Sequence, residues 1–306
     1  MNVLVTGGAG YVGTELVYRL VADSSVKQVV IYDNLIYNNH NIFLGRSKLK
    51  SDKVRFVNAD ILDSRRLKKE VDSADVIYHL AAKVTTPFAY HSPHEFDQIN
   101  NWGTAELTYL VEKSKVSKFI YASSLSVYGA SQDALDINAR LNPRTFYGIS
   151  KLHGEQHLDS LHNSHTQVYT LRLGNVYGYS KSMRFDSVIN KFAFEANFTN
   201  RIRIFGDGSQ VRSFIHIDRL SKLLKKIGLE DLKPDTYNLI ENTFDINTIT
   251  DELKLLFPSL EMIYVNQNIK MRSLNVKPDT RISDFSTFPK NTLSADLKNL
   301  KDSFTF

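Results

Sequence analysis

Short apolar runs alternate with segments of helical spacing through the first half of the chain. The runs that suit buried parallel strands lie at 2–7, 29–33, 54–60, 76–82, 118–124 and 168–175. Between them, apolar positions recur with a helical period at 12–22, 64–71, 97–114 and 147–161. Parallel neighbours need crossover connections, which helices usually provide, so this order predicts an α/β fold with a doubly wound parallel sheet.

The alternation weakens beyond residue 176. Shorter mixed elements follow, separated by polar connections such as "GYSKSMRFDS" and "FGDGSQVRS". We therefore predict a Rossmann-type, NAD-binding domain over 1–175 and a smaller, mainly substrate-binding lobe over 176–306. A strand-like stretch near 236–241 is expected to return to the main sheet.

Composition narrows the possible functions. The 306 residues are 42% hydrophobic, and the formal charge of +5, from 38 basic against 33 acidic residues, is spread along the chain. Such diffuse charge does not indicate nucleic-acid binding but suits a small anionic substrate. The absence of cysteine excludes disulfides, thiolate metal sites and a cysteine nucleophile. No apolar run approaches the ~18 residues of a membrane span, and the chain starts directly with a strand, so we expect a soluble, cytoplasmic protein.

A glycine-rich turn follows the first predicted strand. "VTGGAGYVG" places Gly7, Gly10 and Gly13 three apart, which suits a tight turn, close approach to a pyrophosphate and close helix–sheet packing. Asp33 ends the second strand 20 residues after Gly13, where a carboxylate can accept hydrogen bonds from ribose hydroxyls. Because a carboxylate repels a 2′-phosphate, NAD is favoured over NADP. Asp60 ends the third strand and could meet the adenine, although an aspartate that caps a strand or turn fits that position as well.

Polar side chains that could carry chemistry follow the fifth strand. "YASSLSVYG" places Ser123, Ser124 and Ser126 at its end, where any one of them could simply bond the loop backbone. "FYGISK" then places Tyr147 and Lys151 four residues apart on one helix face. A nearby ammonium favours the phenolate, so we expect Lys151 to lower the pKa of Tyr147 from its ordinary value of about 10. Such a group of side chains suits the transfer of a hydride and a proton at an alcohol carbon.

These motifs together resemble the extended short-chain dehydrogenase/reductases, in particular the NAD-dependent epimerase/dehydratase family, which acts on nucleotide sugars. The similar segments are "VTGGAGYVG", "YDNL", "AD", "YHLAA", "INNWGT", "SSLSVYG", "NPRTFYGISKLHGE", "LRLGNVYG" and "GDGSQVRSFIHIDRL". The resemblance implies a catalytic trio of Ser124, Tyr147 and Lys151. It implies cofactor contacts from Gly7, Gly10, Tyr11, Val12, Gly13, Asp33, Asn34, Asp60, Ile61, Leu80, Ala81, Ala82, Lys83, Asn100, Tyr147 and Lys151. It implies substrate contacts from Ser124, Ser126, Tyr147, Asn175, Arg212 and Arg272, with Arg272 equally well explained as a surface arginine.

Departures from the family pattern separate its reactions. The 4,6-dehydratases carry an Asp-Glu pair where this chain has Leu125 and Ser126, and the decarboxylases keep a glutamate there. The sequence therefore favours a nucleotide-sugar epimerase that inverts a hydroxyl, at C4, through a keto intermediate. A 4-keto-sugar reductase using NAD(P)H and a non-catalytic NAD-binding regulator are the alternatives. The resemblance also implies a homodimer through 97–114 and 147–161.

Other polar groups have simpler explanations. His153 and His157 stand four apart in "HGEQH" but lack a third ligand in register, so we predict no metal site. "HSPHE" (91–95) fits a polar loop, and "RRLKK" (65–69) and "KLLKK" (222–226) fit solvated helix faces. His79 lies on an apolar strand and is expected to be a core histidine with satisfied hydrogen bonds.

Overall fold

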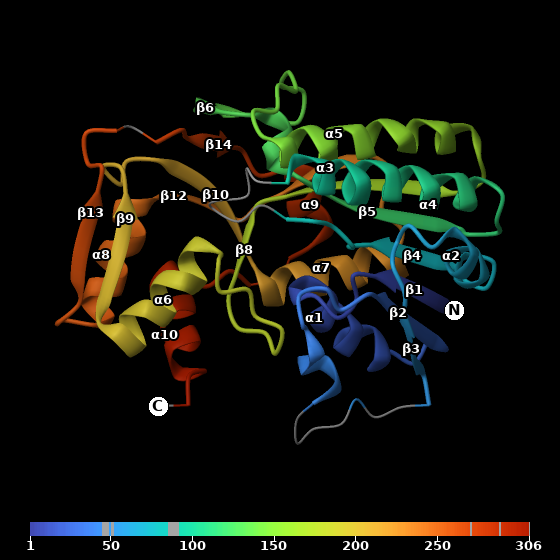
Figure 1. Cartoon of the computed structure of the whole chain (residues 1–306), viewed down its shortest axis with the longest axis horizontal. Helices are drawn as coiled ribbons and strands as arrows, with labels where there is room; N and C mark the ends of the chain where they lie inside the picture. The colour runs from blue at the N-terminus through green and yellow to red at the C-terminus, as the bar shows by residue number, and fades with distance from the viewer. Residues whose placement is uncertain (45–48, 50–51, 85–91, 270, 288, 306) are drawn as a thin grey trace.

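Seven parallel strands form the central sheet of the protein (Figure 1). The computed structural model describes residues 1–44, 49, 52–84, 92–269, 271–287 and 289–305. Across the sheet, the strands are β11 (Thr236–Leu239), β7 (Gln167–Leu173), β5 (Lys118–Ser124), β4 (Val76–His79), β1 (Asn2–Thr6), β2 (Gln28–Asp33) and β3 (Val54–Asn58). Each neighbouring pair is parallel, which confirms the predicted α/β fold with a doubly wound sheet.

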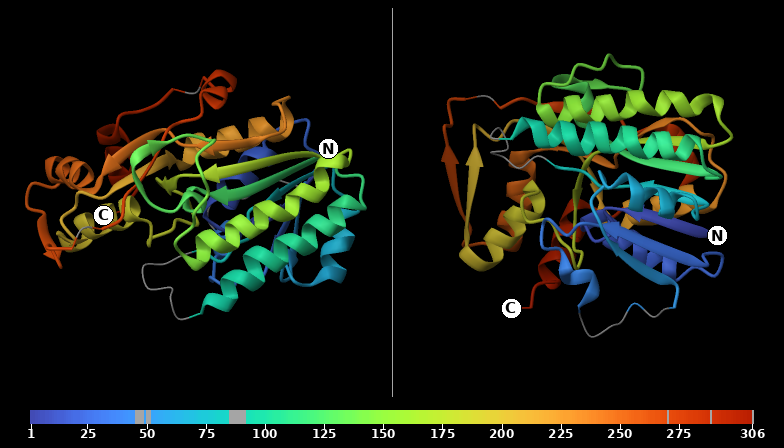
Figure 2. Two further views of the ribbon diagram at one scale, coloured as in Figure 1. Left: turned by 90° about the horizontal axis from the view of Figure 1, so that it is seen from above. Right: turned by 45° about the vertical axis from the view of Figure 1, so that its right-hand side comes forward.

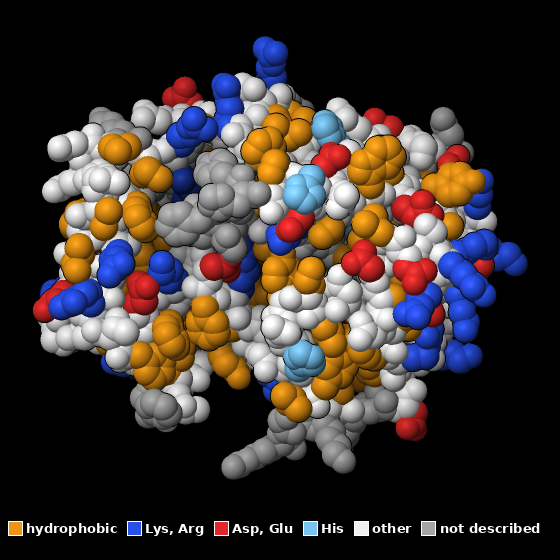
Figure 3. All heavy atoms as spheres, viewed as in Figure 1, with side chains coloured by type: hydrophobic (Ala, Val, Ile, Leu, Met, Phe, Trp, Pro, Cys, Tyr) orange, Lys and Arg blue, Asp and Glu red, His pale blue; other side chains and the backbone are white. Residues whose placement is uncertain are grey.

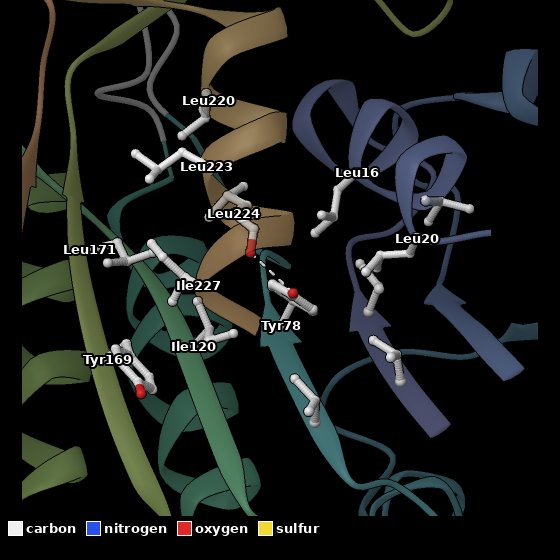
Figure 4. Close-up of a cluster of buried hydrophobic side chains, with 14 of the residues drawn as sticks. Leu16, Leu20, Tyr78, Ile120, Tyr169, Leu171, Leu220, Leu223, Leu224 and Ile227 are labelled. Atoms are coloured by element: carbon white, nitrogen blue, oxygen red, sulfur yellow. Dashed lines mark hydrogen bonds between the residues drawn. The ribbon is translucent and has the colours of Figure 1, made fainter. Parts of the chain in front are cut away.

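Helices cover both faces of this sheet. Successive strand residues point to opposite faces, so Val3 and Val5 join one core cluster and Leu4 joins the other. The first face is covered by α1 (Tyr11–Val21) and α7 (Ile217–Leu229), whose leucines meet Tyr78 and Ile120 (Figure 4). The second face is covered by α2 (Ser64–Val71), α4 (Gly103–Glu112) and α5 (Phe146–His157).

The second half of the chain forms smaller sheets beside the main one (Figure 2). Its remaining strands are β8 (Asn175–Tyr177), β9 (Arg201–Phe205), β10 (Val211–His216), β12 (Asn242–Asp245), β13 (Glu261–Val265) and β14 (Leu274–Val276). Its remaining helices are α6 (Val188–Thr199), α8 (Ile246–Leu256), α9 (Thr280–Phe285) and α10 (Leu293–Asp302). A third hydrophobic cluster lies among α6, α8, α10 and their strands.

The chain crosses between the two regions more than once. The segment 236–239 forms β11, which lies beside β7 at one edge of the main sheet. In return, β6 (Ser131–Leu135) leaves the first half and pairs with β14. The division at residue 175 therefore describes the course of the chain only approximately, and as a domain boundary it stays a prediction.

One predicted helix is divided in the structure. The segment 97–114 consists of a π-helix, Asp97–Trp102, followed by α4, and the short α3 (Pro93–Phe96) precedes it. The apolar periodicity could not reveal this, because a π-helical turn inserts one extra residue without removing the amphipathic face. None of the described helices is long and apolar enough to cross a membrane.

Candidate active site

The glycine turn after β1 leaves room for a ligand beside the backbone. Gly7 has a φ of +70°, and a Cβ there would lie 2.6 Å from the backbone nitrogen of Ala81. A Cβ on Gly13 would lie 2.3 Å from the carbonyl oxygen of Gly7, so only glycine permits this close packing of α1 on the turn. No side chain caps the start of α1 after Gly10, which leaves its first N–H groups able to bind a phosphate.

Asp33 is held in position by two backbone groups. Its carboxylate accepts hydrogen bonds from the nitrogen of Ala9 at 3.0 Å and from the nitrogen of Leu35 at 2.9 Å. Burial raises the pKa of this carboxyl group. Asp60 lies nearby, bonding the side-chain amide of Asn34 at 2.7 Å and the backbone nitrogen of Leu62 at 3.0 Å. Asp60 therefore lies next to the Asp33 site and also stabilises its own turn, so both interpretations of this residue fit.

A pocket opens between these groups. Most of the predicted cofactor contacts line it: Gly7, Gly10, Asp33, Asn34, Asp60, Ile61, Leu80, Ala81, Ala82 and Lys83. The other lining residues, which no sequence motif singled out, are Tyr32, Ile36, Tyr37, Asn39, Ala59 and Ile99. The bare glycine turn, the uncapped helix start and the fixed carboxylate together fit a dinucleotide with its pyrophosphate at α1 and a ribose at Asp33.

Tyr11, Val12 and Gly13 lie on α1 outside this lining. The Tyr11 hydroxyl is directed to the other region of the chain, where it donates to the carbonyl of Gly178 at 2.5 Å and accepts from the Asn190 amide at 3.2 Å. Its side chain thus joins the glycine turn to the segment after β8.

Ser124 and Tyr147 meet at the carboxyl end of β5. Ser124 ends the strand, is 9% exposed, and forms a hydrogen bond with the Tyr147 hydroxyl. The Ser124 hydroxyl also bonds the hydroxyl and the backbone nitrogen of Ser126, each at 3.2 Å. Tyr147 lies in the first turn of α5, which Thr145 caps by accepting from the nitrogen of Gly148 at 3.0 Å.

The expected lowering of the Tyr147 pKa is not found in this structure. Burial raises the pKa of Tyr147, and the opposing influences are its hydrogen bond with Ser124 and the charge of Arg184. Lys151 is only 2% exposed, and burial lowers the pKa of its ammonium group to about 7. The Lys151 Nζ atom lies 4.7 Å from the centre of the Tyr121 ring. Desolvation of both groups therefore outweighs the attraction that their spacing suggested.

Asn100 joins the pocket to the catalytic helix. It lies in the π-helix, is 1% exposed, and bonds the backbone nitrogen and carbonyl of Lys83 at 2.8 and 2.9 Å. The same side-chain amide donates to the hydroxyl of Ser150 on α5 at 3.0 Å. Asn100 therefore supports the site from outside the pocket, while the Lys83 ammonium pairs with Glu95 and lies 5.6 Å from the Tyr37 ring.

The predicted substrate residues lie on and beside β8 and β10. These strands are neighbours, and the Asn175 amide donates to the carbonyl of Ser213 at 3.1 Å. Arg212 donates to its neighbour's carbonyl at 2.8 Å and to the carbonyl of Arg272, whose own side chain is exposed. Burial lowers the pKa of the Arg212 guanidinium. Within the described part of the chain, no carboxylate forms an ion pair with Arg212, so the structure leaves its charge available to an anionic ligand.

The structure also places two charged residues near the candidate active site that no sequence motif singled out, Arg184 and Glu155. Arg184 lies close enough for its charge to affect Tyr147, Tyr37 and Tyr11, yet it comes from a segment that had only been described as polar. Glu155, the middle residue of "HGEQH", forms a buried ion pair with Arg172. A charged residue four positions after Lys151 was the available signal for Glu155.

Two of the histidines noted in the sequence, His79 and His157, have hydrogen-bond partners within the described structure. His79 is fully buried and bonds the Thr6 hydroxyl at 2.8 Å and the Thr104 hydroxyl at 3.0 Å, which confirms a satisfied core histidine. His157 bonds the Asn101 amide oxygen at 2.6 Å. Of the "HSPHE" segment, His91 lies outside the described residues. In the ranges that are described, no group of three His, Asp or Glu side chains is placed to hold a metal ion.

Comparisons with known proteins agree with this geometry. Residues 3–239 match the model of the NAD dependent epimerase/dehydratase family. A putative UDP-glucose 4-epimerase of Methanocaldococcus jannaschii is 31% identical over 226 residues, which cover 72% of this chain and 71% of the relative. A human dTDP-D-glucose 4,6-dehydratase is 28% identical over 81% of this chain and 71% of its own length.

Solved structures of the same kind extend over nearly the whole chain. A UDP-glucuronic acid 4-epimerase from Bacillus cereus, crystallised with UDP-glucuronic acid and NAD, superimposes with a TM-score of 0.86. It is 26% identical and covers 99% of this chain and 98% of its own. The resemblance found in the sequence is thereby confirmed, and the chain belongs to the NAD dependent epimerase/dehydratase family.

Proposed function

We propose that this protein is an NAD-dependent nucleotide-sugar 4-epimerase. The observations that carry the proposal are the contact of Ser124 with Tyr147 at the carboxyl end of β5, with Lys151 one helical turn further along α5, and the pocket with a glycine turn and Asp33. Related proteins are named UDP-glucose 4-epimerase and UDP-glucuronic acid 4-epimerase, which supports inversion at C4.

The residues of the pocket support positions for the pyrophosphate and the adenosine ribose of the cofactor. The turn at Gly7 and Gly10 and the start of α1 would hold the pyrophosphate, and Asp33 would bind the adenosine ribose. When bound, NAD would supply a hydride acceptor in its oxidised form and a hydride donor in its reduced form at C4 of the sugar. There is no net oxidation, so the cofactor would stay bound through turnover.

The proton at the sugar oxygen is handled by the protein. Tyr147, as phenolate, would accept the proton of the C4 hydroxyl as the C–H bond breaks, and would donate it back to the same oxygen in the return step. Ser124 already bonds Tyr147 and would donate to the reacting oxygen. The charge of Arg184 already acts to lower the pKa of Tyr147, and Lys151, as an ammonium one helical turn further along α5, would add to that effect.

An anionic substrate is supported by Arg212. Its guanidinium is desolvated and bonds only backbone carbonyl groups in the described structure. A diphosphate would supply the missing negative charge with suitable geometry, and Asn175 on the neighbouring strand would bind beside it. Arg272 contributes its carbonyl to the position of Arg212, and we propose that its exposed side chain adds a further phosphate or sugar contact.

The dehydratase reaction of some relatives does not fit this site. Elimination of water needs an acid and a base next to the sugar, whereas the residues after Ser124 are Leu125, which is buried in a hydrophobic cluster, and Ser126. We propose that Ser126 contacts the substrate as a hydrogen-bonding group, a role that its bond with Ser124 supports.

We further propose a cytoplasmic homodimer, with α4 and α5 as its interface. These helices lie side by side on one face, over which hydrophobic side chains gather (Figures 1 and 3). The exposed apolar residues there include Trp102, Tyr109, Phe146 and Ile149, which are 61, 53, 46 and 38% exposed.

The test is to identify the bound cofactor and the product. Purified protein would be analysed by mass spectrometry for copurified NAD, and UDP-, GDP-, CDP- and dTDP-sugars would be incubated with it and followed by NMR. We expect interconversion of a pair of C4 epimers without consumption of added NAD(H). The variant Tyr147→Phe should lose at least about 100-fold in kcat, whereas Tyr109→Phe on the exposed face of α4 should keep it.

The alternatives predict different results. Stoichiometric consumption of NAD(P)H with a 4-keto sugar would identify a reductase. Failure to turn over any sugar of the panel, with NAD still bound, would identify a regulator. Full activity of Tyr147→Phe on the true substrate would refute the mechanism.

A further inference from the structure

A buried ion pair joins the catalytic helix to the sheet. Arg172 on β7 donates from Nε to Glu155 Oε1 at 3.0 Å and from Nη2 to Glu155 Oε2 at 2.7 Å. The two side chains are only 8% and 10% exposed. This is the two-pronged geometry in which arginine holds a carboxylate most firmly, and it fixes the second half of α5 against β7.

The pair belongs to a network that reaches each element of the catalytic group. The hydroxyl of Ser123, next to Ser124, donates to Glu155. Arg172 also donates to the Tyr128 hydroxyl at 2.8 Å, and Tyr128 donates to Asn238 at 2.9 Å. Arg172 is in register with Ser123 on β5 and with Asn238 on β11, so the network crosses three neighbouring strands.

Glu155 also lies on the same face of α5 as the catalytic residues. Tyr147, Lys151 and Glu155 follow one another at intervals of four residues. Three groups lie near Lys151 or act on its charge: His79 on β4, Tyr121 on β5 and Glu155 on α5. Tyr147 lies one helical turn before Lys151 on α5. His79 is neutral and both tyrosines are phenols, so within the described structure Glu155 is the anion that acts on the Lys151 ammonium.

We propose that Glu155 and Arg172 are positioning residues of the active site. Arg172 holds the Glu155 carboxylate in place beneath α5, and that carboxylate supplies the negative charge that favours the ammonium form of the buried Lys151 side chain. This inference rests on the proposed function in one respect, since it assumes that the reaction uses Lys151 as a cation.

A purely structural role would not need these charges. Replacing a buried ion pair by apolar residues of similar volume is often neutral or stabilising, so helix packing alone is a weak reason to retain it. The packing of α5 on β5 is already close at Gly154, where a Cβ would lie 2.2 Å from the Tyr121 hydroxyl oxygen. Two influences act on the pKa of Lys151 in opposite directions. Burial lowers it to about 7, and the charge of Glu155 acts to raise it, as the proposed role of Glu155 requires.

The test measures the protonation of Lys151 directly. The NAD-loaded protein would be labelled with ¹³Cε-lysine, and the Lys151 signal, assigned with a Lys151→Arg variant, would be titrated by NMR. In Glu155→Gln we expect its midpoint to move down by about one pH unit, because an opposite charge has been removed. Above the midpoint one pH unit changes the ammonium fraction about tenfold, so kcat at pH 8 should fall by up to about tenfold while KM stays within about twofold.

Glu70→Gln is the matched control. Glu70 is a buried helix glutamate that pairs with Arg55 on β3, the strand at the opposite edge of the sheet from β11. This change should alter the unfolding temperature without moving the Lys151 midpoint or the pH profile of kcat. If Glu155→Gln alone does not fold, the double variant Glu155→Gln/Arg172→Met leaves no unpaired buried charge and should show a smaller downward shift, because the positive charge of Arg172 is removed as well.

The outcomes separate this inference from the proposed function. An unchanged Lys151 midpoint in Glu155→Gln or in the double variant would overturn it. So would a midpoint that moves while the pH profile of kcat does not. If no nucleotide sugar is turned over by the wild type, the proposed function fails, and the NMR titration still decides whether Glu155 controls the charge of Lys151.

Discussion

Tyr147 and Lys151 show how burial changes the chemistry of a residue pair. Their spacing on α5 brings them to one face, but both are out of water, and desolvation favours the neutral form of each. The groups that oppose desolvation come from elsewhere in the fold: Ser124 and Arg184 for the tyrosine, and Glu155 for the lysine. At the residue scale, the sequence predicted which side chains belong to the site, but it did not predict their protonation states.

His79 gives a pH-dependent prediction at the same scale. Burial lowers its pKa from 6.5 to about 3, so the folded protein keeps it neutral while the unfolded chain protonates below pH 6.5. The unfolded state then binds more protons, and the contribution of His79 to stability, complete above pH 6.5, is lost as the pH falls toward 3. Between pH 6.5 and 4.5 this loss amounts to about 2–3 kcal/mol.

The variant His79→Gln tests this. It should be less stable than the wild type at pH 7, because the hydrogen bonds with Thr6 and Thr104 are altered. Glutamine does not titrate, so the difference between the two proteins in the free energy of unfolding should narrow by about 2–3 kcal/mol at pH 4.5. Urea unfolding at both pH values measures it, and a difference independent of pH would contradict the explanation.

At the scale of single elements, the π-helix Asp97–Trp102 is the feature that positions the site most directly. It turns Asn100 inward so that one amide bonds the end of the β4 segment and α5 together. π-helical turns are often found at functional sites, and here the extra residue links cofactor pocket and catalytic helix. From the sequence, Asn100 could be placed in a helical segment, but the π-helical turn around it could not be predicted.

We predict that Asn100→Ala is costly for both stability and cofactor binding. It leaves the backbone groups of Lys83 and the Ser150 hydroxyl without their buried partner, which should lower the free energy of unfolding by about 2–4 kcal/mol. NAD affinity should fall too, because Lys83 lines the pocket. Denaturant unfolding and calorimetric titration with NAD measure the two effects. Asn101→Ala, in the same π-helix but less buried, is the control, and an equal loss of NAD affinity there would refute a specific role for Asn100.

At the scale of the whole molecule, the exposed apolar side chains on the face of α4 and α5 form the surface that we propose a second copy of the chain covers. Both helices bury their other sides on the sheet, yet four large apolar residues on α4, α5 and the π-helix before α4 stay in water. A second copy of the chain would cover them in a four-helix arrangement.

Light scattering after size-exclusion chromatography tests the homodimer. The wild type should have the mass of two chains, and the double variant Trp102→Glu/Tyr109→Glu should have the mass of one, because two charges would be buried against apolar surface. Leu255→Glu, at a position 75% exposed on α8, should leave the mass unchanged. A monomeric wild type, or a variant that stays dimeric, would contradict this interface.

Much of this protein was predictable from local patterns. The strand and helix order, the glycine turn, the acid at the end of β2 and the serine, tyrosine and lysine each depend on residues close together in the sequence, whose geometry follows from the periods of strands and helices. These features sufficed to predict the fold class and the family. They also predicted the site residues, and most of the predicted cofactor contacts line one pocket.

Only the tertiary structure decided the electrostatics and the supports of the site. Arg172 lies 17 residues beyond Glu155, Asn100 lies 50 residues before Ser150, and Asn238 lies 110 residues beyond Tyr128. These contacts arise from packing across the sheet, and no period in the sequence encodes them. The charge of Lys151 and the pKa of Tyr147 depend on the same packing, because desolvation is a property of the folded chain around a side chain and not of the side chain itself.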